Sequence, residues 1–454
     1  MLNFLPKIPT TRTDHPMDDE QRKNDAPNGS PKPGKLRVSL SNEWHARPLM
    51  VMAAPLRCSH IVCLRGDASL AERRELFAEF CREQGQSEPN AESRHHSIQV
   101  GNCSLKWEGH SEADAYSLLV PGNGEPPFAA PALDFLESNM RADLEDARFI
   151  GVHIEVLPDD GQVIEERLGR IRSLLGATQV YGGSFSDGLG ELWSSFRLDA
   201  DGFQRLVVTD FGLGEARLSR YLQRILEIES YRLLAMMALP AARRVMASLG
   251  QLEIELDDVM SELSHHETDP AQERQLERIT RIAARVEHVA AEHAYRFAAA
   301  RAYSGIVDRR LSELAEDRSG AASRYTTYLT KTLQPAMRTC EAVERRTQEL
   351  AQRITRATQL LDSMVDLDQK KQNQAILQRM AESASSQLRL QQSVEGFSIF
   401  AITYYAVGLL GYLFKSGKEL GMPLDPGLLT GLSAPFVLGV VWWSVRRVKK
   451  QLRP

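Results

Sequence analysis

Two stretches near the C-terminus constrain this chain most, because each is too apolar to be stable in water as an isolated helix. Phe397–Phe414 and Leu428–Val445 each contain eighteen residues and no Asp, Glu, Lys or Arg. As helices they would be about 27 Å long, close to the thickness of a hydrocarbon core. The polar segment Lys415–Gly427 connects them. The sequence therefore predicts a two-helix transmembrane hairpin over residues 396–445.

The cations around this hairpin predict its orientation. Two arginines precede the first stretch, only Lys415 and Lys418 lie between the two, and a basic tail over residues 446–454 follows the second. Because Lys and Arg concentrate on the cytoplasmic side, we expect both ends of the chain in the cytoplasm. The predicted membrane-interface residues are Trp442, Trp443, Arg446 and Arg447.

Small residues within the two stretches favour close packing of the helices. Gly408 and Gly411 lie in the first stretch, and Gly431 and Gly439 in the second. Such residues let helix backbones approach one another in a membrane. The hydroxyl groups of Thr403, Tyr404 and Tyr405 could instead line a polar path. No charged residue enters either stretch to mark an ion or proton route, so we favour packing.

Composition bounds the rest of the chain. With 454 residues, 43% apolar and 25% charged, it has room for two further structural regions. The net charge of −5 argues against nucleic-acid binding. Five cysteines without a C-x-x-C pair argue against a disulfide framework or a zinc site. We predict no metal, no cofactor and no catalytic residue. Residues 1–35 are rich in proline and lack a signal peptide, which predicts a disordered cytosolic arm.

Residues 36–213 predict an α/β or α+β cytosolic domain. Helical spacing of apolar residues occurs in Ser69–Gln84 and Ile164–Leu175. Strand candidates are recognised by length and by β-branched or aromatic content. They are His60–Leu64, Ser97–Trp107, Ala115–Val120, Phe149–Leu157, Thr178–Ser186, Leu192–Leu198 and Phe203–Val208.

Residues 214–395 predict long antiparallel and coiled-coil-like helices. Beyond Pro335, taken as a break, apolar residues from Val343 to Met364 repeat at coiled-coil spacing. Ala336–Glu395 would form a helix of about 90 Å that runs directly into the first membrane stretch. Because such a helix cannot bury its own apolar face, it must pack on the helices before it, on copies of itself, or on both, so we expect a homo-oligomer.

The polar segment Asn42–Pro48 contains the main candidate ligand site. Pro48 favours extended backbone before it, which puts Glu43, His45 and Arg47 on one face. They could bind an anionic ligand, or His45 could act as an acid or base. A structural ion-pair network that fixes the domain's first segment is the favoured alternative.

A second polar patch and a glycine-rich stretch have simpler interpretations. Trp107, Glu108, His110 and Glu112 are interpreted as one solvated strand face. The stretch from Gly182 to Gly190 lacks the Lys-Ser/Thr of a phosphate loop, so it is interpreted as a turn between strands.

Several segments together resemble a bacterial family described as domain of unknown function 3422 and as membrane-anchored. They are Leu40–Pro48, Trp107–His110, and Arg220–Arg232 with Leu239 and Pro240. The resemblance covers Leu36 to the C-terminus, although Gly109 stands where the family has a cation. It implies anchoring in the bacterial inner membrane and specifies no reaction.

Within the third of these segments, charged residues lie beside an apolar helix face. Arg224 can reach Glu227, and Glu229 can reach Arg232, one turn apart. We interpret these four residues as interdomain coupling between the helix and the α/β domain, in preference to a chemical role.

Three hypotheses for function follow. The first is a non-enzymatic, membrane-anchored and oligomeric interaction or sensing protein with an unknown cytosolic partner or ligand. The second is a divergent ion channel, because the plan of domain, long helix and hairpin resembles CorA-type magnesium channels. The Gly-Met-Asn signature of those channels is missing, since Tyr412–Gly417 reads YLFKSG. The third is a membrane-tethered enzyme that uses His45.

Overall fold

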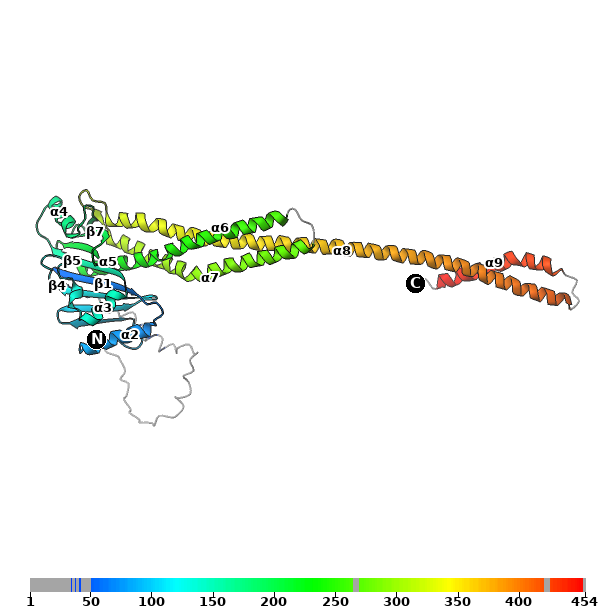
Figure 1. Ribbon diagram of the computed structural model, residues 1–454, viewed down its shortest axis with the longest axis horizontal. Helices are drawn as coiled ribbons and strands as arrows, with labels where there is room; N and C mark the ends of the chain where they lie inside the picture. The colour runs from blue at the N-terminus through cyan, green and yellow to red at the C-terminus, as the bar shows by residue number, and fades with distance from the viewer. Residues whose placement is uncertain are drawn as a thin grey trace, which may run out of the picture. The chain divides into compact units, whose positions relative to one another are not determined.

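The computed structural model describes residues 34, 37, 41, 50–263, 269–419 and 425–451. Most of the predicted N-terminal arm lies outside these residues. The predicted order of a mixed-sheet region followed by long helices is confirmed (Figure 1).

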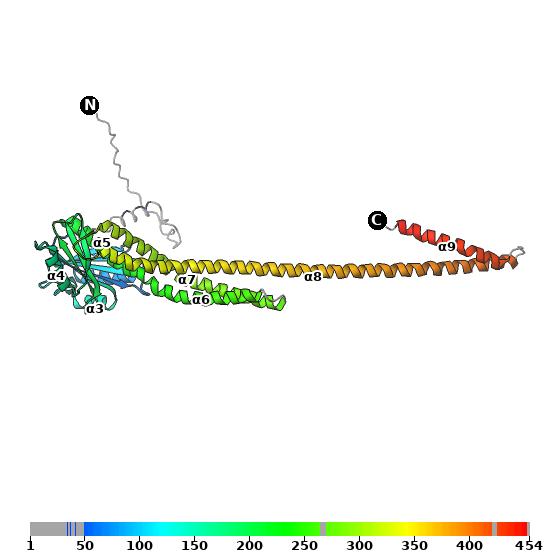
Figure 2. The ribbon, with the colours of Figure 1, turned by 90° about the horizontal axis from the view of Figure 1, so that it is seen from above.

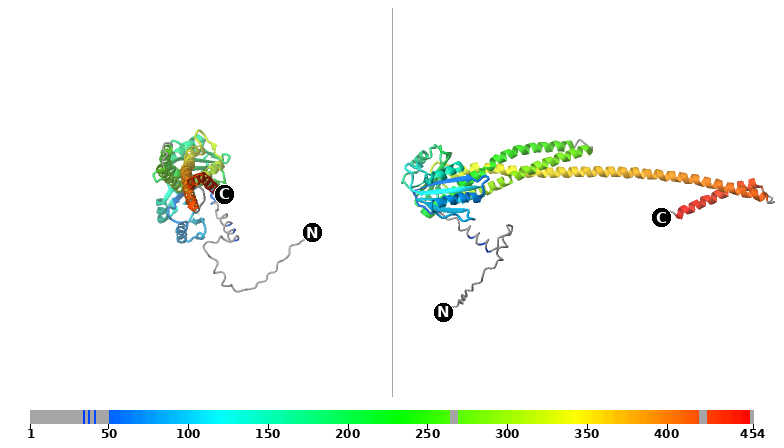
Figure 3. Two further views of the ribbon diagram at one scale, coloured as in Figure 1. Left: turned by 90° about the vertical axis from the view of Figure 1, so that its right-hand side faces the viewer. Right: turned by 60° about the horizontal axis from the view of Figure 1, so that its bottom comes forward.

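Within the described residues, nine strands form one sheet with the order β2-β3-β4-β1-β5-β8-β7-β6-β9. Neighbouring strands are antiparallel except β5 and β8, which are parallel. Figure 3 shows the strands before α5 in blue to green. Their bounds are β1 Leu56–Leu64, β2 His95–Val100, β3 Cys103–Gly109, β4 Ala113–Pro121, β5 Arg148–Pro158, β6 Tyr181–Phe185, β7 Gly190–Leu198, β8 Gln204–Asp210 and β9 Asp317–Arg318.

Six of the seven predicted strand segments coincide with single strands, and one was wrong. Ser97–Trp107 is two strands, because the chain reverses at Gly101, which has a φ of 59° that glycine tolerates at little cost. The glycine-rich segment is confirmed as a turn between β6 and β7. Gly182 also allows close strand packing, since a Cβ there would lie 2.0 Å from the Leu192 carbonyl oxygen.

The two faces of the sheet are covered by different helices. On one face, Trp107 and Tyr116 pack with Phe77 of α2, and Val207 packs with Ile171 of α4. The bounds on this side are α2 Leu70–Glu83, the 3-10 helix η2 Ala132–Phe135, α3 Ser138–Asp146 and α4 Ile164–Leu174. Period-two alternation sends the intervening residues to the opposite face, where α5, Glu215–Met236, packs.

The remaining helices are α6 Ala238–Leu263, α7 Asp269–Leu314, α8 Tyr325–Glu419 and α9 Pro426–Gln451. The prediction that Pro335 breaks the chain into separate helices was wrong, because α8 begins at Tyr325 and continues through Pro335 for 95 residues. Proline removes one backbone donor and costs about 3 kcal/mol in a helix interior. Buried neighbours such as Leu333 and Met337 provide packing that offsets this cost.

The chain divides into two units. Unit 1 comprises Met1–Leu252 and Arg285–Glu349, and unit 2 comprises Glu253–Ala284 and Leu350–Pro454. Unit 1 contains the whole sheet. In unit 2, the ends of α6 and α7 lie beside α8 (Figures 1 and 2), where Arg353 of α8 pairs with Asp257 of α6 at 2.5 Å.

Three helical stretches among the described residues could cross a membrane by length and composition alone. They are Glu215–Glu262, Tyr325–Gly417 and Pro426–Arg447. The apolar window of the first is 39% buried within the protein, whereas those of the second and third are 6% and 0% buried. Packing of the polypeptide therefore covers part of the first stretch and leaves the other two almost entirely uncovered.

Candidate functional site

Helix α5 brings buried polar side chains to its contact with the sheet. Its apolar residues Leu218, Leu222 and Ile225 recur at helical spacing and are fully or almost fully buried. Glu229 and Ser230 are buried on the same helix. Because a buried polar group is costly unless it is hydrogen-bonded, the partners of these two residues define the local structure.

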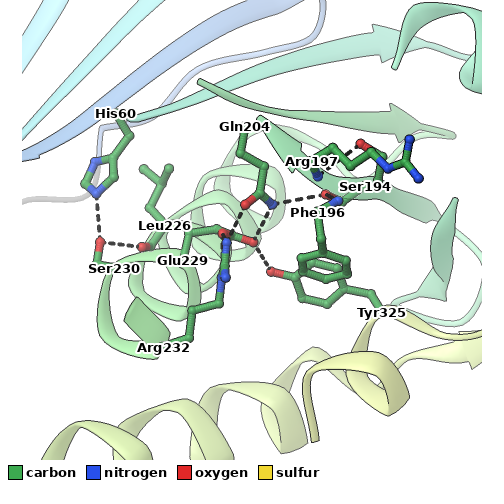
Figure 4. Close-up of polar contacts among 11 residues, drawn as sticks. His60, Ser194, Phe196, Arg197, Gln204, Leu226, Glu229, Ser230, Arg232 and Tyr325 are labelled. Atoms are coloured by element: carbon green, nitrogen blue, oxygen red, sulfur yellow. Dashed lines mark hydrogen bonds and ion pairs between the residues drawn. The ribbon is translucent and has the colours of Figure 1, made fainter. Parts of the chain in front are cut away.

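Glu229 is the centre of a hydrogen-bonded network (Figure 4). One carboxylate oxygen accepts hydrogen bonds from the Tyr325 hydroxyl at 2.5 Å and from Gln204 Nε2 at 3.2 Å. The other accepts from Arg232 Nε at 2.7 Å. Arg232 also donates to Gln204 Oε1, and Gln204 Nε2 donates to Ser194 Oγ at 3.0 Å. The network thus joins β7, β8, α5 and the first residue of α8.

The charges in this network are mutually stabilised. Burial alone would lower the pKa of Arg232, but Glu229 raises it above its usual value. Burial, with the negative charge of Glu229 second, raises the pKa of Tyr325 well above its usual value. The guanidinium therefore stays charged and the phenol stays a hydrogen-bond donor. Groups that are held in one protonation state and hydrogen-bonded to one another are suited to joining elements and poorly suited to proton transfer.

His60 of β1 makes a second polar link to α5. Its Nδ1 lies 2.9 Å from Ser117 Oγ and its Nε2 lies 2.8 Å from Ser230 Oγ. The Ser230 hydroxyl donates to the Leu226 carbonyl at 2.7 Å, so its oxygen accepts the hydrogen bond that joins it to Nε2, and Nε2 is the donor. This assigns the Nε2–H tautomer to the neutral ring. Burial lowers the pKa of His60 to about 4, which keeps the ring neutral at physiological pH.

Beside His60, α5 and strands β3 and β4 enclose a cavity of about 60 Å³. One water molecule needs roughly 10–15 Å³ of such volume, so the cavity has room for a few waters or one very small ligand. Apolar residues such as Leu119 and Leu222 form part of the wall. The polar lining comprises His60, Lys106, Glu108, His110, Ser117, Ser219, Gln223, Glu227, Ser230 and Tyr231.

Lys106 and Glu108 form a largely buried ion pair in this wall. Lys106 Nζ lies 3.1 Å from Glu108 Oε1, and the side chains are 8% and 20% exposed. Burial alone would raise the pKa of Glu108, but a hydrogen bond from His95 and the charge of Lys106 hold it well below its usual range. The cavity therefore presents one fixed positive and one fixed negative charge to its contents.

An ion pair joins the loop between β3 and β4 to α7 at the edge of the cavity. Glu112 accepts two hydrogen bonds from the Arg296 guanidinium, at 2.9 and 2.5 Å. The ring of Tyr231 contacts His110 and stacks on Tyr303, with ring centroids 5.7 and 5.4 Å apart. A bidentate Arg–carboxylate pair fixes geometry as well as charge, so these contacts hold the cavity rim in one arrangement.

The interpretation of Trp107, Glu108, His110 and Glu112 as one solvated strand face was wrong. Trp107 faces the hydrophobic core on the other side of the sheet, and Glu108 and His110 line the cavity under α5. Gly109 marks a close approach, because a Cβ there would lie 2.4 Å from Leu70 Cδ1. A larger residue would require Leu70 to move.

The four coupling residues predicted on α5 form pairs within that helix and contacts with α7, α8 and β8. Besides the Glu229–Arg232 pair, Arg224 pairs with Glu313 of α7 at 3.2 Å, and Glu227 pairs with Arg310 of α7. The predicted one-turn pairing therefore holds for Glu229 and Arg232, whereas Arg224 and Glu227 each use a partner on α7. The predicted ligand residues Glu43, His45 and Arg47 lie outside the described residues.

The predicted hairpin residues lie on α8 and α9, and α9 turns back beyond the end of α8 and diverges from it (Figures 2 and 3). A Cβ at Gly411 would lie 3.4 Å from Thr430, so the two helices approach closely there. A Cβ added at Gly408, Gly431 or Gly439 would have no described atom within 4 Å, apart from its own helix. The arginines stack on the tryptophans one turn before them, Arg446 on Trp442 and Arg447 on Trp443, at 4.9 and 5.1 Å.

Sequence reasoning missed His60, Lys106, Ser230 and Tyr325. For Lys106, a signal was present: Lys106 and Glu108 alternate with Leu105 and Trp107, which indicates a polar and an apolar face of one strand. Tyr325 offered no local signal, because its partner Glu229 is 96 residues away.

One family model matches residues 32–452 and carries the description "Protein of unknown function (DUF3422)". No curated protein and no solved structure matches the chain. The similarity in plan to CorA-type channels therefore stays a prediction.

Proposed function

Since this chain belongs to the DUF3422 family, whose description names no reaction, we propose a function from its own residues. The protein is a non-enzymatic interaction or sensing protein, anchored in the bacterial inner membrane by a hairpin of α8 and α9. Its sheet-containing unit binds a cytosolic partner or ligand.

The observation that carries the proposal is the exposure of large apolar side chains on the end of α8 and on α9. Phe397, Phe400 and Tyr404 are 75%, 69% and 77% exposed, and Leu432 and Phe436 are both 74% exposed. Fully burying one Leu or Phe is worth about 1.5–3 kcal/mol, so leaving this many in water would be very costly. A bilayer would cover them on all sides.

Charge supports a cytoplasmic location for both ends. Arg446 and Arg447 directly follow the apolar part of α9, and Arg389 precedes that of α8. The connection between the helices contains only Lys415 and Lys418, fewer cations than the two flanking segments together. The stacked Trp442–Arg446 and Trp443–Arg447 pairs suit a membrane interface, where an amphipathic ring and a cation both find favourable contacts.

The cavity beneath α5 supports binding in preference to catalysis. Lys106 and Glu108 neutralise one another, and both ring nitrogens of His60 are already hydrogen-bonded. Fixed charges of both signs can orient a small polar ligand without taking part in bond making. The Glu229 network begins beside this cavity and ends on Tyr325, the first residue of α8.

Removal of the hairpin tests the proposal. A chain lacking Gly396–Pro454 should move from the membrane pellet to the soluble fraction after cell lysis, because it loses both bare apolar stretches. A chain lacking residues 1–33 is the matched control and should still pellet. If the chain without the hairpin also pellets after an alkaline wash, then the membrane contact lies elsewhere and the proposal is wrong.

A further inference from the structure

A part of α8 in unit 2 is exposed on every side although it lies outside the apolar stretch. Further toward its beginning, α8 is still covered, since Leu361 is only 1% exposed. From Ile376 to Gln391 every residue of α8 is exposed. These sixteen residues end six residues before Phe397, so they lie between the three-helix packing and the proposed membrane span.

The apolar residues of this segment share one side of the helix. Leu377, Met380 and Leu388 are 64%, 63% and 61% exposed. With Ile376, Ala381, Ala384 and Leu390 they occupy an arc of about 180°, at 100° per residue, which is wide enough for a helix face that packs on a partner. Within the residues that the structure describes, this face has no covering element.

The charged residues of the segment lie outside this face. Arg379, Glu382 and Arg389 all fall outside the apolar arc when the helix is projected at 100° per residue. The polar residues inside it, Ser383, Gln387 and Gln391, are uncharged and can both donate and accept hydrogen bonds. Two identical copies can therefore meet on this face without bringing like charges together, and each glutamine can pair with its counterpart.

The unbroken course of α8 decides what can cover this face. If Phe397–Phe414 crosses the bilayer, the helix leaves the membrane without a bend, and residues 376–391 lie about 9–32 Å beyond Phe397. Lipid tails cannot follow it there. Because every copy would be anchored in the same membrane, residues 376–391 of all copies would point in the same direction and lie at the same distance from the bilayer. This arrangement favours parallel pairing of identical segments.

We infer that residues 376–391 of α8 form a homotypic interface, in which the apolar face of one chain packs against the same face of a second, parallel copy. This inference rests on the proposed membrane anchor. It identifies the partner as the chain itself and gives the surface that mediates the contact.

Cysteine cross-linking in native membranes tests the interface. The five native cysteines are all buried, so they give a low background. Met380→Cys and Leu388→Cys place thiols on the apolar face, and Gln378→Cys and Ser386→Cys place them at nearly the same height on the opposite side. In a packed pair of helices, the Cα atoms of two residues on the sides facing away from the contact would be about 13 Å apart. This distance is the roughly 8–10 Å between the helix axes plus the ~2.3 Å Cα radius of each helix. A disulfide needs less than about 7 Å. Mild oxidation should therefore give several-fold more dimer with the apolar-face thiols.

A charge variant gives a second measurement. Met380→Glu with Leu388→Glu puts like charges opposite each other and should lower the dimer fraction of the full chain in mild detergent several-fold. Gln378→Glu with Ser386→Glu adds the same charge to the other side and should leave that fraction unchanged.

Fractionation separates the two proposals. Every variant should pellet with membranes, and a wild-type chain that fails to pellet would refute the anchor. If the chains pellet but cross-linking is equal on both sides, the homotypic interface is refuted. Cross-linking of the apolar-face thiols to a different protein would refute it too, because the partner would then be another chain.

Discussion

Removal of the Glu229 carboxylate tests the energetic importance of the buried network beneath α5. Glu229 is 0% exposed, and its oxygens accept from Arg232, Gln204 and the buried Tyr325 hydroxyl. In Glu229→Ala, the Arg232 charge loses its counter-ion and the phenol loses its acceptor. Breaking a buried ion pair by removing one partner costs about 3–5 kcal/mol, and we expect the free energy of unfolding to fall by that amount.

Glu227→Ala is the matched control on the same helix. Its pair with Arg310 is partly solvated, with side chains 22% and 29% exposed, so we expect a loss of at most about 1 kcal/mol. The double variant Glu229→Leu with Arg232→Leu should recover part of the loss, because it leaves no uncompensated charge.

Pulse proteolysis of the full chain in mild detergent, over a urea series, measures the free energy of unfolding for each variant. The reasoning is refuted if Glu229→Ala loses no more stability than Glu227→Ala. It is also refuted if the double variant is less stable than Glu229→Ala, since an unpaired Arg232 would then not be the source of the loss.

Two further predictions use the same assay. Burial lowers the pKa of His60 from 6.5 to about 4. Between these pH values the unfolded chain therefore binds a proton that the folded chain does not. The free energy of unfolding should fall by roughly 3 kcal/mol in total as the pH drops from about 6.5 to 4. His60→Asn should remove this part of the pH dependence. An unchanged pH profile would contradict the assignment of this stability change to His60. Gly182→Ala should destabilise the sheet by more than about 3 kcal/mol, because its Cβ would lie 2.0 Å from the Leu192 carbonyl oxygen. Gly169→Ala, in an open position of α4, should instead be neutral or stabilising by up to about 1 kcal/mol, and equal losses in both variants would contradict the packing argument.

Local patterns in the sequence predicted much of the secondary structure. Strands reveal themselves through length and β-branched content, and α2 shows the Ser69–Glu72 capping box that starts a helix. The continuation of α8 through Pro335 could not be predicted locally, because proline's preference to end a helix was outweighed by packing along the helix. Likewise, the strand error at Gly101 arose because one residue with positive φ reverses the chain within an otherwise strand-like segment.

The candidate site depended on contacts that sequence spacing does not encode. His60 and Ser230 are 170 residues apart, and Glu229 and Tyr325 are 96 apart. Residues 42–49, which hold the most distinctive polar motif, lie outside the described structure. Sequence reasoning recognised the charged residues of α5 and a polar strand at Glu108, but it had no means to place one against the other.

The sequence by itself determined that this chain contains long apolar helices, because hydropathy and helical periodicity are properties of consecutive residues. It did not determine which of them the folded protein would cover. Glu215–Glu262 also satisfies the length and composition of a membrane span, yet part of it packs on the sheet, whereas the apolar stretches of α8 and α9 remain bare. Only the tertiary structure decided this, because burial depends on whether distant segments supply a complementary apolar surface.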